Sequence, residues 1–218
     1  MPDLPITAVA FDMDGLMFNT ENVYFQAGCR LMERRGHVFT KELSDAVTGA
    51  SPQRSFETMI AWHGLQDITW QELHQESQDT FFELLDGMLA LMPGLLPLLD
   101  YLERKRIPKA ICTCSSRRVL EGVLGRFHME PRFDFTITAD DISHGKPHPE
   151  IYLKAAERFG VSPERMLILE DSEAGCNAGA NAGAFIVAVP GAHSRHMDFS
   201  RAKMVLEGLD DPRIFEII

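Results

Sequence analysis

Two aspartates that stand two residues apart, Asp12 and Asp14, follow an apolar run that ends at Phe11 and are followed by Gly15. A buried strand that ends in a glycine turn places both carboxylates at the carboxyl end of the strand, where open α/β sheets bind their ligands. One carboxylate of such a pair can attack an electrophile while the other donates and accepts protons. The pair by itself fits a plain Asp-Gly turn equally well, so other residues of the chain are needed to distinguish a catalytic pair from a structural turn.

Three further groups of polar residues occur near the ends of later apolar runs. Thr113 ends the run that begins at Lys109, and its hydroxyl suits a phosphate oxygen together with the N–H groups of a following helix. Lys146 stands in a Gly-Lys-Pro loop, where an ammonium neutralises a phosphate or a nucleophile; a solvated loop lysine is the alternative. The adjacent acids Glu170 and Asp171 repel each other unless a cation lies between them.

Taken together, these residues predict a site for a metal ion and a phosphate group. Asp12, Asp14 and the Glu-Asp pair offer oxygen ligands alone, which suit Mg²⁺ rather than zinc. Thr113 and Lys146 are the candidate phosphate ligands. Two histidines, at positions 144 and 148, flank the lysine; we favour a hinge or a substrate contact for them over metal binding, because the lysine puts a cation between them.

The elements that must position these residues alternate between strands and helices. Apolar runs predict strands at Ile6–Phe11, Lys109–Cys114, Phe133–Thr138, Met166–Leu169, Phe185–Val189 and, as a short sixth, Met204–Leu206. Helical patterns lie between them at Leu95–Lys105, Arg117–Phe127, Glu150–Phe159 and Glu173–Ala182. The alternation predicts an α/β fold, a doubly wound parallel sheet with helices on both faces.

The stretch from residue 18 to residue 88 shows helical patterns only. Helices are expected at Glu21–Arg35, Lys41–Val47, Pro52–His63 and Trp70–Asp86, the last of them after a capping box of Thr69 and Glu72. We therefore expect a Rossmann-like catalytic core of residues 1–17 and 89–218 and an inserted helical cap domain of residues 18–88. The insertion holds five basic and eleven acidic residues, so a small phosphate is a better ligand for it than a polyanion.

Composition narrows the class of protein. The 218 residues are 45% hydrophobic and 24% charged, as in ordinary globular proteins, and the formal net charge of −11 argues against nucleic-acid binding. The chain has no apolar stretch of membrane-spanning length and no basic and apolar leader, so we expect neither membrane insertion nor secretion. Cys112 and Cys114 lack the partners of a zinc site, so we expect buried, reduced thiols in a cytoplasmic protein.

In their order along the chain, the motifs resemble those of the haloacid dehalogenase (HAD) superfamily of phosphohydrolases, and the resemblance covers essentially the whole chain. The four motifs appear as Asp12-x-Asp14-Gly15, Thr113, Lys146 in His-Gly-Lys-Pro, and Glu170-Asp171-Ser172-x-x-Gly175. The early helical insertion resembles a type C1 cap, which places the chain near the β-phosphoglucomutase and phosphoglycolate phosphatase group.

The resemblance implies a reaction mechanism. Asp12 would attack phosphorus and become an aspartyl phosphate, and Asp14 would protonate the leaving alcohol and then activate water. The cap would close over the site and supply specificity. We therefore expect a Mg²⁺-dependent phosphatase that acts on a small phosphorylated metabolite, such as a sugar phosphate, as a monomer or a weak homodimer.

The resemblance also implies which residues bind the metal and the substrate. The Mg²⁺ ligands would be Asp12, the backbone carbonyl of Asp14, and the pair Glu170 and Asp171. The phosphoryl group would be held by Thr113, by Cys114 through its backbone, and by Lys146.

Sugar-phosphate mutases of the same group differ from phosphatases at two positions. They carry a His in a Thr-x-x-x-His pattern after the first motif, where this chain has Thr20 and Tyr24. They also carry an Arg after Gly-x-Ser in the cap, where Gly49-Ala50-Ser51 is followed by Pro52. Both departures favour a phosphatase; a mutase and a catalytically silent binding or regulatory relative are the alternatives. Arg54 either reaches the substrate from the cap or is a solvated residue in the first turn of a helix.

Overall fold

The core of the molecule is a single parallel sheet; the structure, a computed structural model, describes residues 2, 4–48 and 50–218. The strands in the described residues are β1 (Ala8–Phe11), β2 (Lys109–Cys112), β3 (Phe135–Ile137), β4 (Met166–Glu170), β5 (Phe185–Ala188) and β6 (Met204–Val205). They lie in the order β3-β2-β1-β4-β5-β6, and each neighbouring pair is parallel. The predicted α/β fold with a doubly wound parallel sheet is confirmed.

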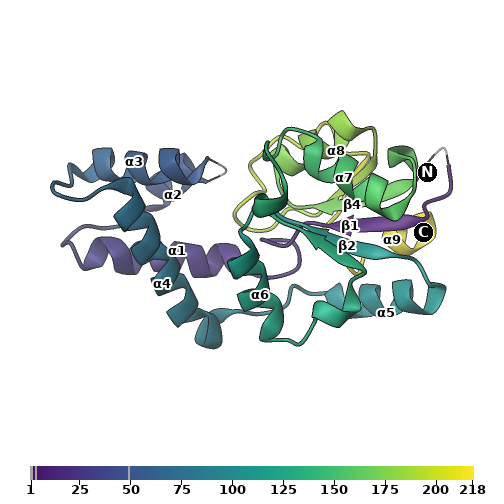
Figure 1. Ribbon diagram of the computed structural model, residues 1–218, viewed down its shortest axis with the longest axis horizontal. Coiled ribbons are helices and arrows are strands. Elements are labelled where there is room, and N and C mark those ends of the chain that lie inside the picture. The colour runs from purple at the N-terminus through teal and green to yellow at the C-terminus, as the bar shows by residue number, and fades with distance from the viewer. Residues whose placement is uncertain (1, 3, 49) are drawn as a thin grey trace. The chain divides into compact units, whose positions relative to one another are not determined.

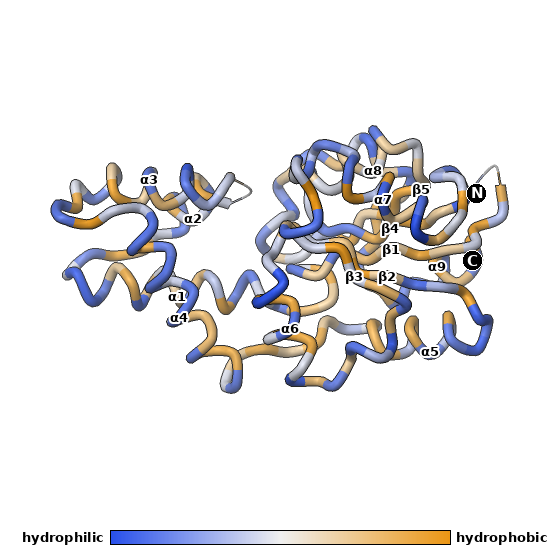
Figure 2. Tube along the Cα trace, viewed as in Figure 1, coloured by the Kyte–Doolittle hydropathy of each residue, from blue (hydrophilic) through white to orange (hydrophobic). Residues whose placement is uncertain are grey.

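Helices cover both faces of this sheet (Figure 1). They are α5 (Leu95–Lys105), α6 (Arg117–Gly125), α7 (Glu150–Phe159), α8 (Glu173–Ala182) and α9 (Pro212–Ile217), with short 3-10 turns at η1 (Glu130–Arg132), η2 (Ala139–Asp141) and η3 (Pro163–Arg165). Figure 1 shows α7 and α8 on one face and α5 and α6 on the other. Because both faces are covered, β1, β2, β4 and β5 are buried along their whole length, and Figure 2 shows them as largely apolar segments.

The second strand along the chain is shorter than its sequence predicts. It ends at Cys112, and after one further ladder hydrogen bond, from Thr113 N to Ile137 O (3.0 Å), the chain turns towards α6, whose N-cap is Ser116. Cys112 is buried but Cys114 is exposed, so the prediction of a buried thiol at position 114 is wrong. The reason is that side chains alternate across a sheet only while the backbone stays in the pleat.

The described residues form two compact units, one within residues 1–19 and 90–218 and the other within residues 20–89. The first contains the sheet. The second contains α1 (Thr20–Glu33), α2 (Lys41–Val47), α3 (Pro52–His63) and α4 (Trp70–Met88). The boundaries expected from the sequence stand at 17/18 and 88/89, and the roles of catalytic core and cap stay predictions.

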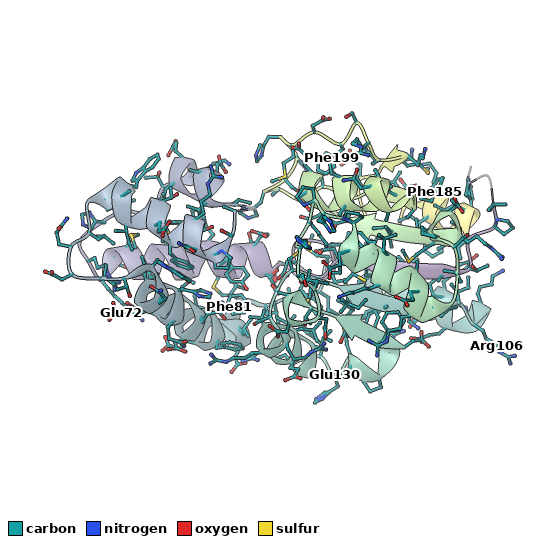
Figure 3. All side chains as sticks on the ribbon, turned by 45° about the horizontal axis from the view of Figure 1, so that its top comes forward. Glu72, Phe81, Arg106, Glu130, Phe185 and Phe199 are labelled. Carbon is teal, nitrogen blue, oxygen red and sulfur yellow. The ribbon has the colours of Figure 1, made fainter. Side chains whose placement is uncertain are left out.

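The helical unit has an apolar core of its own. Its fully or almost fully buried side chains include Leu31, Met32, Phe39, Leu43, Met59 and Leu73. Tyr24 stacks on Phe81, which is labelled in Figure 3, with ring centroids 4.2 Å apart. Thr69 and Glu72 form the capping box expected at the start of α4, with Glu72 N donating to Thr69 Oγ1 (3.2 Å) and Thr69 N donating to Glu72 Oε2 (2.8 Å).

Among the described residues, no helix combines the length and the apolar character that crossing a membrane requires.

Candidate active site

The two aspartates lie at the carboxyl end of β1, which is flanked by β2 and β4. Asp12 N donates to Leu169 O of β4 (3.0 Å), so the ladder continues one residue beyond the strand, and Asp12 is only 7% exposed. Gly15 has a φ of 78°, and a Cβ at this position would overlap the Asp171 carboxylate. Only glycine satisfies both conditions, and the turn therefore brings the end of β1 into close contact with the end of β4.

Lys146 comes from the loop before α7, and its ammonium lies inside the same site. Its side chain is 7% exposed, and its Nζ donates to Asp12 Oδ1, to Cys112 O (2.9 Å) and to Glu170 Oε1 (2.6 Å). These contacts use all three hydrogens of the ammonium group. Lys146 is therefore a buried partner of two carboxylates and not a solvated loop residue.

Glu170, the last residue of β4, is completely buried and accepts hydrogen bonds at both carboxylate oxygens. Oε1 accepts from Lys146 and from the Tyr152 hydroxyl (2.6 Å each). Oε2 accepts from Asp171 N (3.2 Å), Ser172 N (3.3 Å) and Ser172 Oγ (3.0 Å). A Cβ on Gly175 would overlap this carboxylate, so the glycine of the fourth motif leaves the space that the Glu170 side chain occupies. The side chain of Glu170 is fixed on every side.

Three acidic side chains converge beside Lys146 and could hold a metal ion. Asp12, Glu170 and Asp171 are all buried, and each offers a carboxylate oxygen within 4.8 Å of the other two. Asp171 also accepts a long hydrogen bond from Ser194 Oγ (3.4 Å). Three carboxylates face one ammonium, which leaves surplus negative charge in a buried place. Oxygen donors with surplus charge fit a hard divalent cation.

Burial and charge set the protonation behaviour of the site. Burial raises the pKa of Asp12 well above its ordinary value; Lys146 opposes this effect, while Glu170 and Asp14 add to it. Burial by itself lowers the pKa of Lys146, but the attraction of Asp12 and Glu170 outweighs burial and the pKa is raised. The lysine therefore stays charged, and the Asp12 carboxylate depends on a neighbouring cation to remain ionised.

The second aspartate, Asp14, is oriented by two hydroxyls. Its Oδ2 accepts from Thr113 Oγ1 (2.9 Å) and Ser115 Oγ (2.8 Å), and Ser115 N donates back to Thr113 Oγ1 (2.9 Å). Its Oδ1 is buried and has no hydrogen-bond partner among the described residues. Thr113, predicted as a phosphate ligand, thus donates its hydroxyl to Asp14 in this structure, and its contact with phosphate stays a prediction.

The remaining predicted residues lie in different surroundings. Cys114 is exposed and follows Thr113 at the same edge of the sheet. Arg54 belongs to the helical unit, where it is exposed and its backbone N–H donates to the Oγ of Ser51, the N-cap of α3 (3.4 Å). Its substrate contact stays a prediction.

Three residues of the site were not predicted from the sequence. Ser115 stands two residues after Thr113, so its place in the same motif was an available signal. Tyr152 lies inside α7 and Ser194 lies on the loop after β5, and no local pattern marks either as a partner of an acid. Only the packing of α7 and of that loop against the strand ends reveals them.

A scan against protein families matches residues 6–183 to the haloacid dehalogenase-like hydrolase model. A phosphorylated carbohydrates phosphatase from Thermotoga maritima is 34% identical over 179 residues, which are 81% of each chain. A β-phosphoglucomutase from Bacillus subtilis is 31% identical over 84% of this chain and 82% of its own. The crystal structure of CbbY from Rhodobacter sphaeroides in complex with phosphate superposes with a TM-score of 0.82 at 26% identity, covering 94% of this chain and 96% of that one.

Proposed function

Because the chain belongs to the haloacid dehalogenase-like hydrolase family, and is thus an enzyme of that type, we propose that it is a Mg²⁺-dependent phosphatase. Its substrate would be a small phosphorylated metabolite, a sugar phosphate or a similar phosphomonoester. One observation carries the proposal: the buried Asp12 carboxylate contacts Lys146 and lies beside the acidic pair Glu170 and Asp171, with a second aspartate two residues on. The similarity to a phosphatase of phosphorylated carbohydrates supports this substrate class.

In the first half of the proposed reaction, an Asp12 carboxylate oxygen attacks the phosphorus atom. The bond from phosphorus to the ester oxygen breaks, and Asp14 gives its proton to that oxygen, so the alcohol leaves and an aspartyl phosphate remains. In the second half, Asp14 takes a proton from a water molecule whose oxygen attacks phosphorus. The bond to Asp12 then breaks, and inorganic phosphate leaves.

The geometry of Asp14 supports its part as acid and base. Thr113 and Ser115 hold Oδ2, which leaves the buried Oδ1 as the oxygen without a partner in the described residues. Oδ1 is therefore the oxygen on which Asp14 would carry the proton. Lys146 would contribute twice, because its charge favours the ionised form of Asp12 and attracts the phosphoryl oxygens.

The donor set of the site fits Mg²⁺. Asp12, Glu170 and Asp171 would hold the ion through carboxylate oxygens, with the backbone carbonyl of Asp14 as the further ligand implied by the family. Glu170 already has five hydrogen-bond donors, so we propose that Asp12 and Asp171 bind most directly and that Glu170 supplies charge. The bound ion would offset the repulsion between Asp12 and an anionic substrate.

The proposal is tested by measuring phosphate release from a panel of sugar phosphates and related monoesters. Asp12→Asn should lower turnover by more than about 10³-fold, because the amide is no nucleophile. The matched control is Glu157→Gln on the exposed face of α7, which should keep full turnover. Phosphate release by Asp12→Asn at the rate of the control variant would disprove the nucleophile. A panel without any turned-over substrate would favour the silent binding or regulatory relative.

A β-phosphoglucomutase-like phosphotransferase is the second candidate, and the similarity to the Bacillus subtilis mutase favours it. Two positions oppose it: Tyr24 is a packing residue stacked on Phe81, and Pro52 occupies the first turn of α3 after its cap Ser51. Gly49, the first residue of the Gly-x-Ser motif, lies outside the described residues. Incubation with β-glucose 1-phosphate separates the candidates, since a phosphatase releases phosphate and a mutase yields the 6-phosphate.

A further inference from the structure

A second group of metal-ligating side chains lies outside the Asp12 cluster, on the segment that carries Lys146. His144, His148 and Glu150 each offer one ligand atom, and these atoms lie within 4.8 Å of one another. The two imidazole rings face each other with their centroids 4.6 Å apart and their planes at 35°. Both histidines are exposed, and Glu150 is the half-buried first residue of α7.

The carboxylate of Glu150 is an anion held in place by its surroundings. Its Oε1 accepts from Ser143 N (3.0 Å) and from Lys154 Nζ (2.8 Å), and its Oε2 accepts from His144 N (2.9 Å). The hydrogen bond from Lys154 is the main cause that lowers its pKa to about 2. Because Lys154 contacts Oε1, the face of Oε2 towards the histidine rings stays clear of the lysine.

The distance between the first two ligand atoms matches that of a shared metal ion. His144 Nδ1 lies 3.1 Å from Glu150 Oε2. Zinc bond lengths of about 2.05 Å to nitrogen and about 2.1 Å to oxygen place two such ligands about 2.9 Å apart at a right angle and about 3.4 Å apart at the tetrahedral angle. The observed separation lies between the two values, so an ion could enter with little movement of either side chain.

We propose that His144, His148 and Glu150 form a binding site for a transition-metal ion of the Zn²⁺ type, separate from the Asp12 cluster. Two imidazoles and one carboxylate favour Zn²⁺, Co²⁺ or Ni²⁺ over Mg²⁺, whereas the all-oxygen cluster favours the hard ion. On binding, the ion takes the place of the hydrogen between His144 Nδ1 and Glu150 Oε2, and the neutral imidazole of His144 carries its hydrogen on Nε2. His148 completes three protein ligands, and water fills the rest of the coordination shell.

A metal ion bound at this site would affect the loop that carries Lys146. Lys146 lies between the two histidines in sequence, and its Nζ contacts Asp12, Cys112 and Glu170. An ion bound by residues on both sides of Lys146 would hold this loop to the start of α7. Binding to the folded chain alone then stabilises it, so the melting temperature should rise with the Zn²⁺ concentration.

Calorimetric titration of the full chain with Zn²⁺ in excess Mg²⁺ tests the site. We expect binding to the wild type, and at least tenfold weaker binding to the double variant His144→Ala/His148→Ala and to Glu150→Gln. The matched control is His128→Ala/His196→Ala, which removes two exposed histidines of the same unit and should bind as the wild type does. Asp12→Asn should also keep the histidine-dependent binding, so the result is independent of the proposed phosphatase activity.

Three experimental results would overturn the proposal. Unchanged Zn²⁺ affinity in the double histidine variant would show that these side chains are not ligands. The exposed thiol of Cys114 is the rival ligand, and Co²⁺ distinguishes it, because sulfur ligation produces a sulfur-to-metal charge-transfer band that nitrogen and oxygen ligands lack. Such a band, lost in Cys114→Ser and kept in the histidine variant, would assign the ion to the thiol. A Zn²⁺-dependent rise in melting temperature that persists in the histidine variant would also refute the site.

Discussion

Replacing Tyr152 by Phe would remove one hydroxyl from the buried side of the acidic cluster. The hydroxyl donates to Glu170 Oε1 at 2.6 Å, and both side chains are completely buried. Burial, helped by the charge of Glu170, raises the pKa of Tyr152 well above its ordinary value, so the phenol is a donor throughout the working pH range. A hydrogen bond to a charged group contributes about 1.5–3 kcal/mol to stability. We expect Tyr152→Phe to lower the free energy of unfolding by about 2 kcal/mol and the melting temperature by about 4–8 °C.

The measurement is urea and thermal unfolding of the variant beside a matched tyrosine. Tyr101 of α5 donates its hydroxyl to the neutral Phe215 O at 3.1 Å in a less buried position, so Tyr101→Phe should cost about 1 kcal/mol or less. Both variants keep their aromatic ring, so their difference isolates the charged acceptor and its burial. A loss of stability in Tyr152→Phe no larger than that in Tyr101→Phe would refute the idea that the phenol anchors Glu170.

The packing around Gly175, the ion pair of Glu76 and the acidic cluster each lead to a further expectation. Gly175→Ala should destabilise the fold by about 1–3 kcal/mol, because the added Cβ would overlap the Glu170 carboxylate. The control Gly125→Ala should be nearly neutral, because there is room for a methyl group at that position. Equal melting temperatures of the two variants would contradict this packing. The hydrogen bond from Arg35 lowers the pKa of Glu76 from its ordinary 4.5, so this ion pair stabilises the helical unit above about pH 4.5 and the effect is lost as the pH falls through the lowered pKa. Glu76→Gln should therefore cost less than about 1 kcal/mol at neutral pH and nothing in acid, and a cost independent of pH would disprove the assignment. Chelation by EDTA should abolish turnover and Mg²⁺ should restore it, while full activity without any divalent ion would exclude the metal role.

The strands of the parallel sheet could be predicted because each strand carries its own signal. A parallel strand covered on both faces is largely apolar, and the strands that begin at Ala8, Lys109, Met166 and Phe185 show this pattern apart from a charged residue at one end of β2 and of β4. Strand ends were less predictable. The run from Lys109 stays apolar or small through Cys114, yet the backbone leaves the sheet after Cys112.

The residues that the structure brings together at the strand ends were also predictable in large part. Asp12, Lys146, Glu170 and Asp171 stand next to strands or turns that can be recognised locally, and parallel strands bring their carboxyl ends to one edge. The hydrogen-bond partners of these side chains could not be predicted from the sequence. Nothing near Tyr152 in the sequence indicates that its hydroxyl meets Glu170, which is eighteen residues away along the chain.

The sequence by itself determined the order of strands and helices, the α/β class and the identity of the charged groups at the sheet edge, because backbone periodicity and turn chemistry are local properties. Tertiary structure decided which donor meets which acceptor: Lys146 with Asp12 and Glu170, Thr113 with Asp14, and His144 with Glu150. Pairings of that kind depend on how α7 and the loops pack against the strands. The free energy of that packing comes from many buried contacts between segments, so no single segment of the sequence determines it.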